Sequence, residues 1–546
     1  MQNAAVAQMF EDIADLLEIA GENPFQIRAY RRASEAAATH PKPLEDLEVP
    51  QLRAIDGFGP ATADKTREFL ATGRVAFLEK LREEYPRGLL DLLRVPGLGP
   101  KKVQLLYKER GIASVETLQS ALETGELKGL AGFGPKTLTN LESALRRLGE
   151  MTKELPLFEA MPLCNLVKQM LAESGAQIEI AGDVRRGRET ASSLEFVASG
   201  DATQLQSVAA AFKDLPMVQE LQAESTEQIE VRMRPGIDAV LHLAPAAKFG
   251  TILFRTTGSG AHREAAKQRG LDEDADYSTE AALYKAIDSP VIESELREEG
   301  WEIRSNLVQA NDIRGDLHAH SDWSDGSSSI RQMVAAAQSF GYEYHVISDH
   351  SRALAMANGL DAKRLREQAK AIAEIQSEFP DVKILRGIEC DIMRDGSMDL
   401  DDDILGELDF VIGSVHSAFN LDETTQTGRI IKAISHPLVH MIAHPTGRIV
   451  GSRPAYEVDV AALIEAAKSH GKALEINASY RLDLKAEHAR MAREAGVLLA
   501  IDTDAHSTRM LPNIEWGIST ARRAGLQAKD VLNTKPLAEL LAWLKK

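Results

Sequence analysis

Short apolar runs recur in the second half of the chain, and a polar residue that can bind a metal follows or closes each of them. The clearest runs are Tyr344-His345-Val346-Ile347, Phe410-Val411-Ile412, Met441-Ile442-Ala443 and Val497-Leu498-Leu499-Ala500-Ile501. Short apolar runs of this kind predict buried β-strands. Polar ligands at the carboxyl ends of successive strands are typical of the active site of a β/α barrel. The pattern therefore predicts a barrel with a polar site at one end.

The polar residues in this pattern are histidines and carboxylates. His318 and His320 are two residues apart, so on a strand both imidazoles point to the same side. The candidate ligands are His318, His320, Asp325, His350, Glu389, His416, His444, Asp504 and His506. Nitrogen and oxygen ligands without a thiolate suit manganese, zinc or iron, and there are enough of them for more than one ion. Ordinary histidines of a large domain are the alternative, which the ordered placement at strand ends disfavours.

With these residues, the segment 312–546 resembles a PHP domain (polymerase and histidinol phosphatase), a metal-dependent phosphoesterase fold. The resemblance implies two or three divalent ions, with manganese expected and zinc or iron as alternatives. It implies that Glu389 bridges two ions. His318, His320 and Asp504 would complete the first site, His416 and His444 the second, and Asp325, His350 and His506 would hold a third. The catalytic group would be a metal-bound water positioned by His318, His320, Glu389 and Asp504.

Three further aspartates, Asp316, Asp349 and Asp502, lie one or two residues from these ligands. We interpret them as groups that orient the imidazole N–H groups from behind. Solvated or capping carboxylates are the alternative for each.

Length and composition favour several domains. The chain has 546 residues, of which 44% are hydrophobic, so it can form more than one core. Two cysteines, Cys164 and Cys390, cannot form a disulfide framework, which fits a reducing cytoplasm. There is neither a signal pattern nor an apolar run of about 18 residues. The formal net charge of −19 argues against a broadly basic surface, although local patches and backbone amides still allow DNA binding.

An internal repeat occupies the first part of the chain. Its copies are Ile55-Asp56-Gly57-Phe58-Gly59-Pro60, Val95-Pro96-Gly97-Leu98-Gly99-Pro100 and Leu130-Ala131-Gly132-Phe133-Gly134-Pro135. They resemble helix-hairpin-helix motifs, whose glycines allow a tight turn and whose main-chain amides hold a DNA phosphate regardless of sequence. Lys101, Lys102 and Lys136 add positive charge there. A purely structural helical repeat is the alternative.

The segment Glu22-Asn23-Pro24-Phe25-Gln26-Ile27-Arg28-Ala29-Tyr30-Arg31-Arg32-Ala33 resembles the start of the 8-kDa domain of family X DNA polymerases. The position of that family's lyase lysine corresponds to Lys65 here. A lysine at this position could form a Schiff base with an abasic sugar if its pKa were lowered. We favour the other interpretation, a lysine that contacts DNA or simply lies on the surface.

Residues 151–300 resemble the palm and thumb of the same polymerase family. The resemblance rests on Ile180-Ala181-Gly182-Asp183-Val184-Arg185-Arg186-Gly187-Arg188, Phe249-Gly250, Thr257-Gly258-Ser259-Gly260, Ala282-Leu283-Tyr284 and Glu295-Leu296-Arg297-Glu298. We expect this region to bind DNA through Arg185, Arg186 and Arg188. Surface ion pairs are the alternative for these arginines.

The metal-binding positions of this palm differ from those of the family. Where the family has three aspartates, this chain has Ser193, Glu195 and Val240. Valine cannot bind a cation, and Asp183 would repel the triphosphate that a serine meets in the family. Asp238 lies on the same strand face as Val240 but could replace the lost ligand only after a register shift. We therefore expect a palm retained as a scaffold.

The chain as a whole resembles a bacterial-type family X DNA polymerase with a C-terminal PHP domain and a degenerate polymerase site. The expected fold is multidomain. It comprises an all-α helix-hairpin-helix region at 1–150, an α+β palm and thumb at 151–300, a linker at 301–311 and an α/β PHP barrel at 312–546.

The implied function is that of a metal-dependent phosphoesterase in DNA repair, a 3′→5′ exonuclease or a 3′-end-processing hydrolase. The expected partner is DNA with ends, gaps or nicks, bound without sequence preference, in the cytoplasm at the nucleoid and without a membrane. One alternative is an active, gap-filling family X polymerase. Another is a DNA-end-binding scaffold, or a PHP phosphatase of small phosphate esters. The hairpin repeats disfavour small esters, and the full ligand set disfavours a scaffold without activity.

Overall fold

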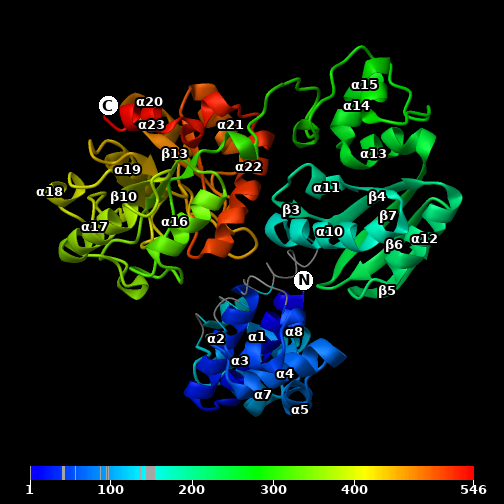
Figure 1. The fold of residues 1–546 in the computed structure, drawn as a ribbon, viewed down its shortest axis with the longest axis horizontal. Helices are drawn as coiled ribbons and strands as arrows, with labels where there is room; N and C mark the ends of the chain where they lie inside the picture. Colours follow the sequence, from blue (N-terminus) through cyan, green and yellow to red (C-terminus); the bar gives the residue numbers. More distant parts are fainter. Residues whose placement is uncertain are drawn as a thin grey trace. The chain divides into compact units, whose positions relative to one another are not determined.

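The computed structural model divides into two compact units, Met1–Met151 and Thr152–Lys546, and each is described by itself. The structure describes residues 2–545 except 40–43, 56, 87, 94, 96, 97, 135, 136, 140, 143, 144 and 146–153. Figure 1 shows the helical first unit and the two larger sheets of the second.

The first unit is built from short helices joined by tight turns. They are α1 (Gln2–Ala20), α2 (Pro24–Thr39), α3 (Val49–Arg53), α4 (Pro60–Thr72), α5 (Ala76–Glu84), α6 (Gly88–Leu93), α7 (Pro100–Arg110) and α8 (Val115–Thr124). Gly57 has a φ of +92°, and a Cβ there would lie 3.1 Å from Arg32 O, so the turn before α4 requires glycine. Gly59 and Gly99 cap α4 and α7, each with proline at the first helical position.

Aromatic packing fixes the first hairpin to the first two helices. The Phe10 ring lies 5.9 Å from that of Phe58 and 6.0 Å from that of Tyr30, and all three side chains are buried. Tilted and edge-on pairs at these spacings are favourable beyond their buried area. The glycine turn at 57–59 is therefore held by the core and not only by its own backbone.

The second unit begins with a five-stranded sheet in the order β2-β4-β7-β6-β5, in which only β4 and β7 are parallel. Its strands are β2 (Gln177–Ala181), β4 (Ser193–Gly200), β5 (Val218–Glu224), β6 (Gln228–Met233) and β7 (Ile237–Pro245). Helices α10 (Leu157–Leu171) and α12 (Ala202–Lys213) cover one face, through side chains such as Val167 and Phe212. The short α11 (Gly182–Arg185) follows β2, and β1 (Leu155–Pro156) pairs with β3 (Thr190–Ala191) beside it.

Three helices follow this sheet: α13 (Phe249–Thr257), α14 (Gly260–Gln268) and α15 (Glu280–Ala286). Helix α13 lies against the sheet (Figure 1), and its Phe249 and Leu253 pack on the other sheet face. A separate small core includes Phe254, Leu283 and Tyr284. The prediction of a thumb falls on these helices.

The last part of the chain is a seven-stranded, all-parallel sheet in the order β14-β13-β12-β11-β10-β9-β8. Its strands are β8 (Gly315–Asp316), β9 (Tyr344–Ile347), β10 (Lys383–Asp391), β11 (Phe410–Ser414), β12 (Met441–Ile442), β13 (Ala473–Asn477) and β14 (Leu499–Asp502). The hydrogen bonds from Asp504 N to His318 O (2.9 Å) and from His320 N to Ala505 O (2.8 Å) join the two ends of the sheet. The sheet is therefore nearly closed into a barrel, as predicted.

Helices surround this barrel (Figure 1). They are α16 (Ile330–Ser339), α17 (Ala362–Gln376), α18 (Asp402–Leu405), α19 (Glu423–Ile434), α20 (Val460–His470), α21 (Ala486–Ala495), α22 (Ile514–Arg523) and α23 (Leu537–Trp543). The barrel interior is filled by apolar side chains such as Leu317, Tyr344 and Phe410, and Leu540 of α23 packs against them. A filled interior leaves the strand ends as the place for polar chemistry.

Within this second unit, the palm loop after α11 packs against the barrel. A Cβ on Gly187, which has a φ of +64°, would lie 1.9 Å from Ser519 Oγ of α22. Glu189 accepts two hydrogen bonds from Arg448, at 2.9 and 2.5 Å. Arg523 of α22 lies 3.3 Å from Glu298. Palm and barrel therefore share close-packed and charged contacts.

Candidate metal centre

The nine predicted ligands all lie at the carboxyl end of the barrel, because each follows or closes a parallel strand. His318, His320 and Asp325 follow β8, His350 follows β9, Glu389 lies near the end of β10, His416 follows β11, His444 follows β12, and Asp504 and His506 follow β14. Parallel strands bring their carboxyl ends to the same edge of a sheet, which is why residues far apart in sequence meet here.

Glu389 lies at the centre of this cluster and is fully buried. Its Oε1 is 3.0 Å from His444 Nε2 and 3.2 Å from His416 Nε2. Its Oε2 is 2.8 Å from His350 Nδ1, 3.5 Å from His318 Nε2 and 3.6 Å from His320 Nε2. The two oxygens of one carboxylate therefore face two different groups of imidazoles, as a bridging ligand would.

Two other carboxylates complete the cluster. Asp504 Oδ1 lies 3.1 Å from His320 Nε2 and 3.7 Å from His318 Nε2. Asp325 Oδ1 lies 3.4 Å from His506 Nε2 and 3.6 Å from His350 Nε2, at the more exposed side. Ligand atoms of His320, Asp325, His350 and His506 fall within 4.8 Å of one another, as do those of His318, His320 and Glu389 and those of His350, Glu389 and His416.

The bonding state of these atoms fits a set of metal ligands. Among the described residues, buried atoms without a hydrogen-bond partner include Glu389 Oε2 and His350 Nδ1, which face each other at 2.8 Å. The Nε2 atoms of His318 and His320 lie only 3.2 Å apart. Buried polar groups are normally paired, so lone pairs that converge without donors suit a cation. The residues could therefore hold divalent ions, with no thiolate to favour a softer metal.

The pKa shifts of the cluster fall into two groups. Burial, together with the neighbouring imidazoles, lowers the pKa of His320 to about 3. Burial and the charge of Arg481 lower the pKa of His444 to about 3. Against the effect of burial, the imidazoles around Glu389 hold its pKa well below its usual range. Against the effect of burial, Glu475 and Glu389 raise the pKa of His318 well above its usual range. Glu389 and Asp391 likewise raise the pKa of His416 to about 10, and Asp325 and Asp504 raise that of His506 to about 9. Carboxylates that crowd imidazoles in this way favour positive charge, which a bound metal would supply once the imidazoles are neutral.

In two of the imidazoles, the other ring nitrogen contacts a carboxylate that was not among the predicted site residues. His318 Nδ1 lies 2.7 Å from Glu475 Oε1 on β13, and His416 Nδ1 lies 3.3 Å from Asp391 Oδ1 on β10. Glu475 also accepts a hydrogen bond of 2.7 Å from His444 N. A carboxylate of this kind fixes the ring orientation and raises the basicity of the ligand. The signal for Glu475 was available: a glutamate between Leu474 and Ile476 in an apolar run.

The three aspartates that we expected in this orienting role contact backbone and hydroxyl groups instead. Asp316 accepts hydrogen bonds from His318 N (3.2 Å) and Thr503 N (3.3 Å). Asp349 accepts one from Ser321 N (2.8 Å), and Asp502 accepts one from Leu317 N (2.8 Å). The prediction was wrong in this detail, because short aspartate side chains beside a strand reach neighbouring amides before they reach an imidazole.

The predicted palm positions lie together on one face of the five-stranded sheet. In the register of β4 and β7, Ser193 is beside Asp238 and Glu195 is beside Val240. Glu195 lies 3.2 Å from His242 Nε2 and accepts a hydrogen bond of 3.2 Å from Ser193 Oγ. Asp238 lies 2.7 Å from Arg232. The carboxylates on this face thus already have protein partners.

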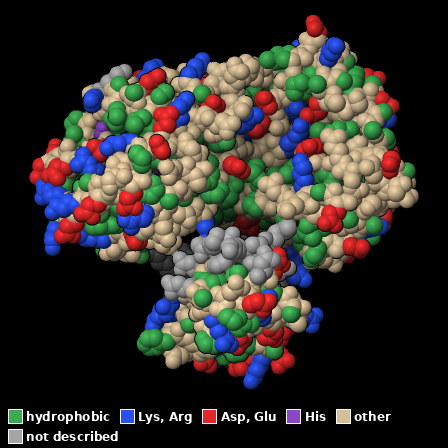
Figure 2. Space-filling model, viewed as in Figure 1, with side chains coloured by type: hydrophobic (Ala, Val, Ile, Leu, Met, Phe, Trp, Pro, Cys, Tyr) green, Lys and Arg blue, Asp and Glu red, His purple; other side chains and the backbone are tan. Residues whose placement is uncertain are grey.

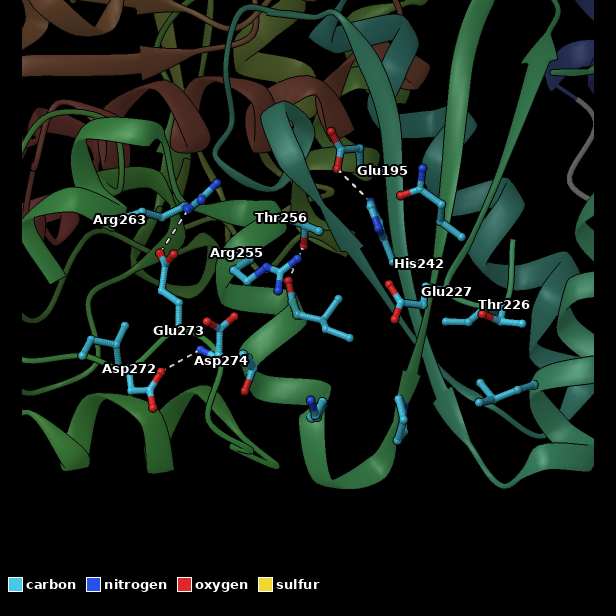
Figure 3. Close-up of a pocket in the computed structure, with 18 of the residues that line it drawn as sticks. Glu195, Thr226, Glu227, His242, Arg255, Thr256, Arg263, Asp272, Glu273 and Asp274 are labelled. Atoms are coloured by element: carbon cyan, nitrogen blue, oxygen red, sulfur yellow. Dashed lines mark hydrogen bonds and ion pairs between the residues drawn. The ribbon is translucent and has the colours of Figure 1, made fainter. Parts of the chain in front are cut away.

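A cavity of about 1100 Å³ opens beside this face, between the sheet and helices α13 and α14 (Figure 3). Glu195 and His242 line its sheet side, and Arg263 and Glu273, 3.1 Å apart, form an ion pair on another part of its wall. Lys267 also lies 2.9 Å from Glu273. Because cations and anions alternate on its wall, the cavity has no strongly positive lining for a triphosphate.

The arginines predicted to contact DNA from the palm are engaged within the protein. Arg185 lies 2.6 Å from Glu280 and donates a hydrogen bond of 2.9 Å to Thr257 Oγ1. Arg186 is 7% exposed, pairs with Asp183 and Glu298, and donates to Thr257 O. These contacts brace the loop between palm and thumb.

In the first unit, the predicted DNA-binding residues gather at hairpin turns. Gly132 has a φ of +81°, and Lys101 is exposed at the start of α7. A cavity of about 1020 Å³ is lined by Gly99, Lys101 and Lys102, and also by Glu18 and Glu22.

The remaining predicted positions of this unit have varied settings. A Cβ added at Gly134, Gly59 or Gly99 would have no neighbouring atom within 4 Å. Lys65 Nζ lies over the Phe77 ring, 4.8 Å from its centroid. Gly97 and Lys136 lie outside the described residues.

On the face drawn in Figure 2, acidic and basic side chains are interspersed over the barrel. Among the described residues, no helix is long and apolar enough to cross a membrane.

The fold and the cluster define a class: a chain with helix-hairpin-helix domains and a PHP domain. Family models support each part. A helix-hairpin-helix domain matches residues 1–75, a SAM-like helix-hairpin-helix tandem matches 89–147, and the PHP domain matches 316–479.

A relative from Bacillus subtilis (strain 168), the DNA polymerase/3'-5' exonuclease PolX, is 36% identical over 572 aligned residues, which cover 100% of both chains. The chain therefore belongs to the PolX family. Its PHP part is also similar to a probable phosphatase of Thermoanaerobacter sp. (strain X514), at 35% identity over 28% of this chain and 64% of the relative. A probable phosphatase of Shewanella sp. (strain MR-4) is 30% identical over 41% of this chain and 89% of the relative.

Proposed function

We propose that this chain is a metal-dependent phosphoesterase that acts on DNA ends in repair, as a 3′→5′ exonuclease or 3′-end-processing enzyme. The observation that carries the proposal is the convergence of the buried Glu389 and eight further nitrogen and oxygen ligands. The name of the Bacillus subtilis relative, which includes a 3'-5' exonuclease, supports the choice of DNA as substrate. The helix-hairpin-helix matches support it independently.

Each part of the cluster has a proposed task. His318, His320, Glu389 and Asp504 would hold one ion, Glu389 with His416 and His444 a second, and Asp325, His350 and His506 a third. Divalent ions at such a cluster supply an activated water and neutralise the charge that gathers on the phosphate. Burial lowers the pKa of His320 and His444, Glu475 and Asp391 fix the rings of His318 and His416, and Arg481 lies 3.5 Å from Asp504. Manganese is the proposed metal, with zinc or iron as alternatives.

The hairpin turns of the first unit are proposed to hold the DNA backbone. Main-chain amides at Gly57–Gly59 and Gly132–Gly134, and the N-terminus of α7 with Lys101, offer contacts that do not depend on base sequence. Arg185 and Arg186 are weaker candidates, since acidic partners already occupy their guanidinium groups. For Lys65 we keep the proposal of a DNA-contacting or surface lysine.

The test is hydrolysis of an end-labelled single-stranded oligonucleotide with manganese. We expect stepwise shortening from the 3′ end by the wild type, and a loss of at least about 100-fold in the double variant His318→Ala, His320→Ala. A matched control replaces two histidines on the barrel's outer helices and loops, His436→Ala with His470→Ala, and should keep full activity. If the double variant at 318 and 320 degrades DNA as well as this control does, the cluster is not the active site.

A second function, gap-filling DNA synthesis by the palm, is favoured by the first half of the relative's name. We propose instead that the polymerase module is impaired, because Ser193 and Val240 offer no carboxylate and Glu195 is already in contact with His242. Primer extension on a gapped duplex, in the His318→Ala, His320→Ala background and with magnesium or manganese, should give no detectable incorporation. Robust extension would establish the second function in its place.

A further inference from the structure

One exposed aromatic side chain, that of Tyr480, is the sequence neighbour of Arg481, which contacts the candidate ligand Asp504. Among the described residues, three aromatic side chains are exposed: Phe25 (75%), Phe340 (44%) and Tyr480 (51%). Phe25 belongs to the first unit, and Phe340 follows α16 at the amino side of the strand β9. Only Tyr480 lies on a segment that follows a barrel strand at the carboxyl end, where the ligands are.

The backbone around Tyr480 is fixed to the metal centre. Asn477, at the end of β13, donates from Nδ2 to Asp504 Oδ2 at 3.2 Å. Ser479 donates to Asn477 Oδ1 from its backbone N (3.0 Å) and from its hydroxyl (2.5 Å). Tyr480 O accepts a hydrogen bond of 3.0 Å from Val450 N. The position of the ring is thus tied to a candidate ligand through a short chain of hydrogen bonds.

Tyr480 and the next residue, Arg481, are directed to different places. The Arg481 guanidinium lies 3.5 Å from Asp504 Oδ2 and is mostly buried. The Tyr480 ring lies 5.0 Å from the Phe158 ring, at an interplanar angle of 76°, and 6.5 Å from the Trp516 ring. Arg481 offers a cation for a phosphate beside the metal ligands, and Tyr480, one residue away, offers an aromatic ring for a base. The two directions match a nucleotide, in which the phosphate and the base also point away from each other.

The packing of the ring leaves area for a ligand. Phe158 meets Tyr480 edge to face, and Phe158 itself lies 5.9 Å from Trp516, so neighbours support the ring from one side. About half of the side chain is still exposed. A purely structural tyrosine between palm and barrel would gain more by full burial. A supported ring also loses little freedom when a base stacks on it.

From this geometry we infer that Tyr480 is a stacking platform for the unpaired terminal base of a DNA strand whose phosphate lies at the metal centre. The inference rests on the proposed function and names its substrate more closely: a single-stranded or frayed end. A base inside a duplex has both faces covered by its neighbours, whereas an unpaired terminal base offers one free face. Stacking on a tyrosine does not depend on base identity.

The experiment compares two oligonucleotides that differ only at the 3′ end, one with an ordinary terminal nucleotide and one with an abasic deoxyribose analogue there. With manganese, we expect the wild type to have a KM about 5- to 100-fold lower for the strand with the base. Tyr480→Ala should bring this ratio close to one, mainly by raising the KM for the strand with the base, while kcat changes little. Tyr480→Phe should keep the ratio.

Tyr480→Leu serves as a second variant, because it keeps apolar packing on Phe158 but removes the aromatic face. It should behave like Tyr480→Ala. If both variants keep the wild-type ratio, or if the wild type cuts the two strands equally well, the platform is refuted while the proposed function stands. If the wild type cuts neither strand, the proposed function fails and the platform with it.

Discussion

Glu389 of the barrel and Glu195 of the palm are both strand residues that face an imidazole, yet their surroundings differ. Glu389 is fully buried, and ring nitrogens of five histidines lie within 3.6 Å of its two oxygens. Glu195 is partly exposed and has one histidine partner, His242, at 3.2 Å. On the palm face, Asp238 likewise has its own arginine, and in the neighbouring loop so does Asp183.

This difference distinguishes a candidate metal-binding site, in the barrel, from a region that we interpret as a structural scaffold, the palm. Asp183, Asp238 and Glu195 each lie beside a basic protein partner, so these carboxylates offer fewer free lone pairs to a cation. In the barrel many lone pairs converge on few protons, which is costly unless an ion is held there. Residue type alone does not distinguish the two regions; the number of unshared ligand atoms does.

The largest expected effect comes from the same substitution made in both regions. Glu389→Gln should remove bound metal and lower the hydrolysis of a small chromogenic phosphodiester at least about 100-fold, because the central ligand loses its charge. Glu195→Gln should change both quantities by less than about twofold, since no ion is expected at that carboxylate. Elemental analysis of protein purified without chelator, together with manganese-dependent rates, makes the measurement. Equal losses in the two variants would break the comparison.

A smaller effect is expected at Glu475, a carboxylate that contacts a candidate ligand but is not itself one. Glu475→Gln keeps the shape of the side chain but removes the charge that lies 2.7 Å from His318 Nδ1. Activity or metal affinity should fall about 10- to 100-fold, the range for carboxylates that orient a ligating histidine. Glu407→Gln, on a surface carboxylate paired with Arg366 at 2.6 Å, is the matched control and should have no effect. An unchanged metal titration in Glu475→Gln would show that His318 needs no such support.

Sequence patterns predicted the barrel well because several of its strands lie in short, mostly apolar runs. The run Tyr344–Ile347 is β9 as the structure has it, and the ligands follow from strand ends in sequence order. The partners of the ligands were harder to predict. Glu475 contacts His318 across 157 residues, and the choice between Glu475 and Asp316 as its support depends on side-chain length and strand register. These quantities belong to the tertiary structure.

In the palm, too, the sequence showed which residue types are present but not which contacts they make. The replacements at Ser193 and Val240 were visible in the sequence, and so was Asp183. Its pairing with Arg186, and the hydrogen bond of 3.1 Å that it accepts from Ser192 N, were not. A carboxylate expected to repel phosphate is thus already neutralised by a loop contact. Charge pairing over short, irregular segments has no periodic signature in sequence.

The smallest expected effect concerns a histidine outside both regions. His262 of the thumb is fully buried, stacks on Trp301 at 4.8 Å and lies 3.0 Å from Tyr284 Oη. Burial lowers its pKa to about 4, against the hydrogen bond to Gly300 O. Its pH response should therefore be independent of metal, in contrast to that of the barrel histidines.

The direction of the pH effect on stability follows from the pKa values of His262 in the unfolded and the folded chain. In the unfolded chain His262 titrates near its ordinary value of about 6.5, so below that pH the unfolded state binds a proton that the native thumb excludes. The stabilisation is complete above pH of about 6.5 and is lost as the pH falls toward about 4; at pH 5 the loss is about 2 kcal/mol. Native-state hydrogen exchange in α14 and α15 at pH 7 and pH 5 measures this loss of stability as a lower opening free energy.

The matched variants decide whether His262 is the source of this pH dependence. His262→Gln should shrink the difference in opening free energy between pH 7 and pH 5 by about 2 kcal/mol, because glutamine does not titrate. His470→Gln, at an exposed histidine of α20, should leave the difference unchanged. A chelator should not alter either result, since His262 contacts aromatic rings and a backbone carbonyl and not the ligand cluster. If the pH dependence of the thumb disappears when metal is removed, His262 and the barrel are coupled, and the separation drawn between the two kinds of buried histidine does not hold.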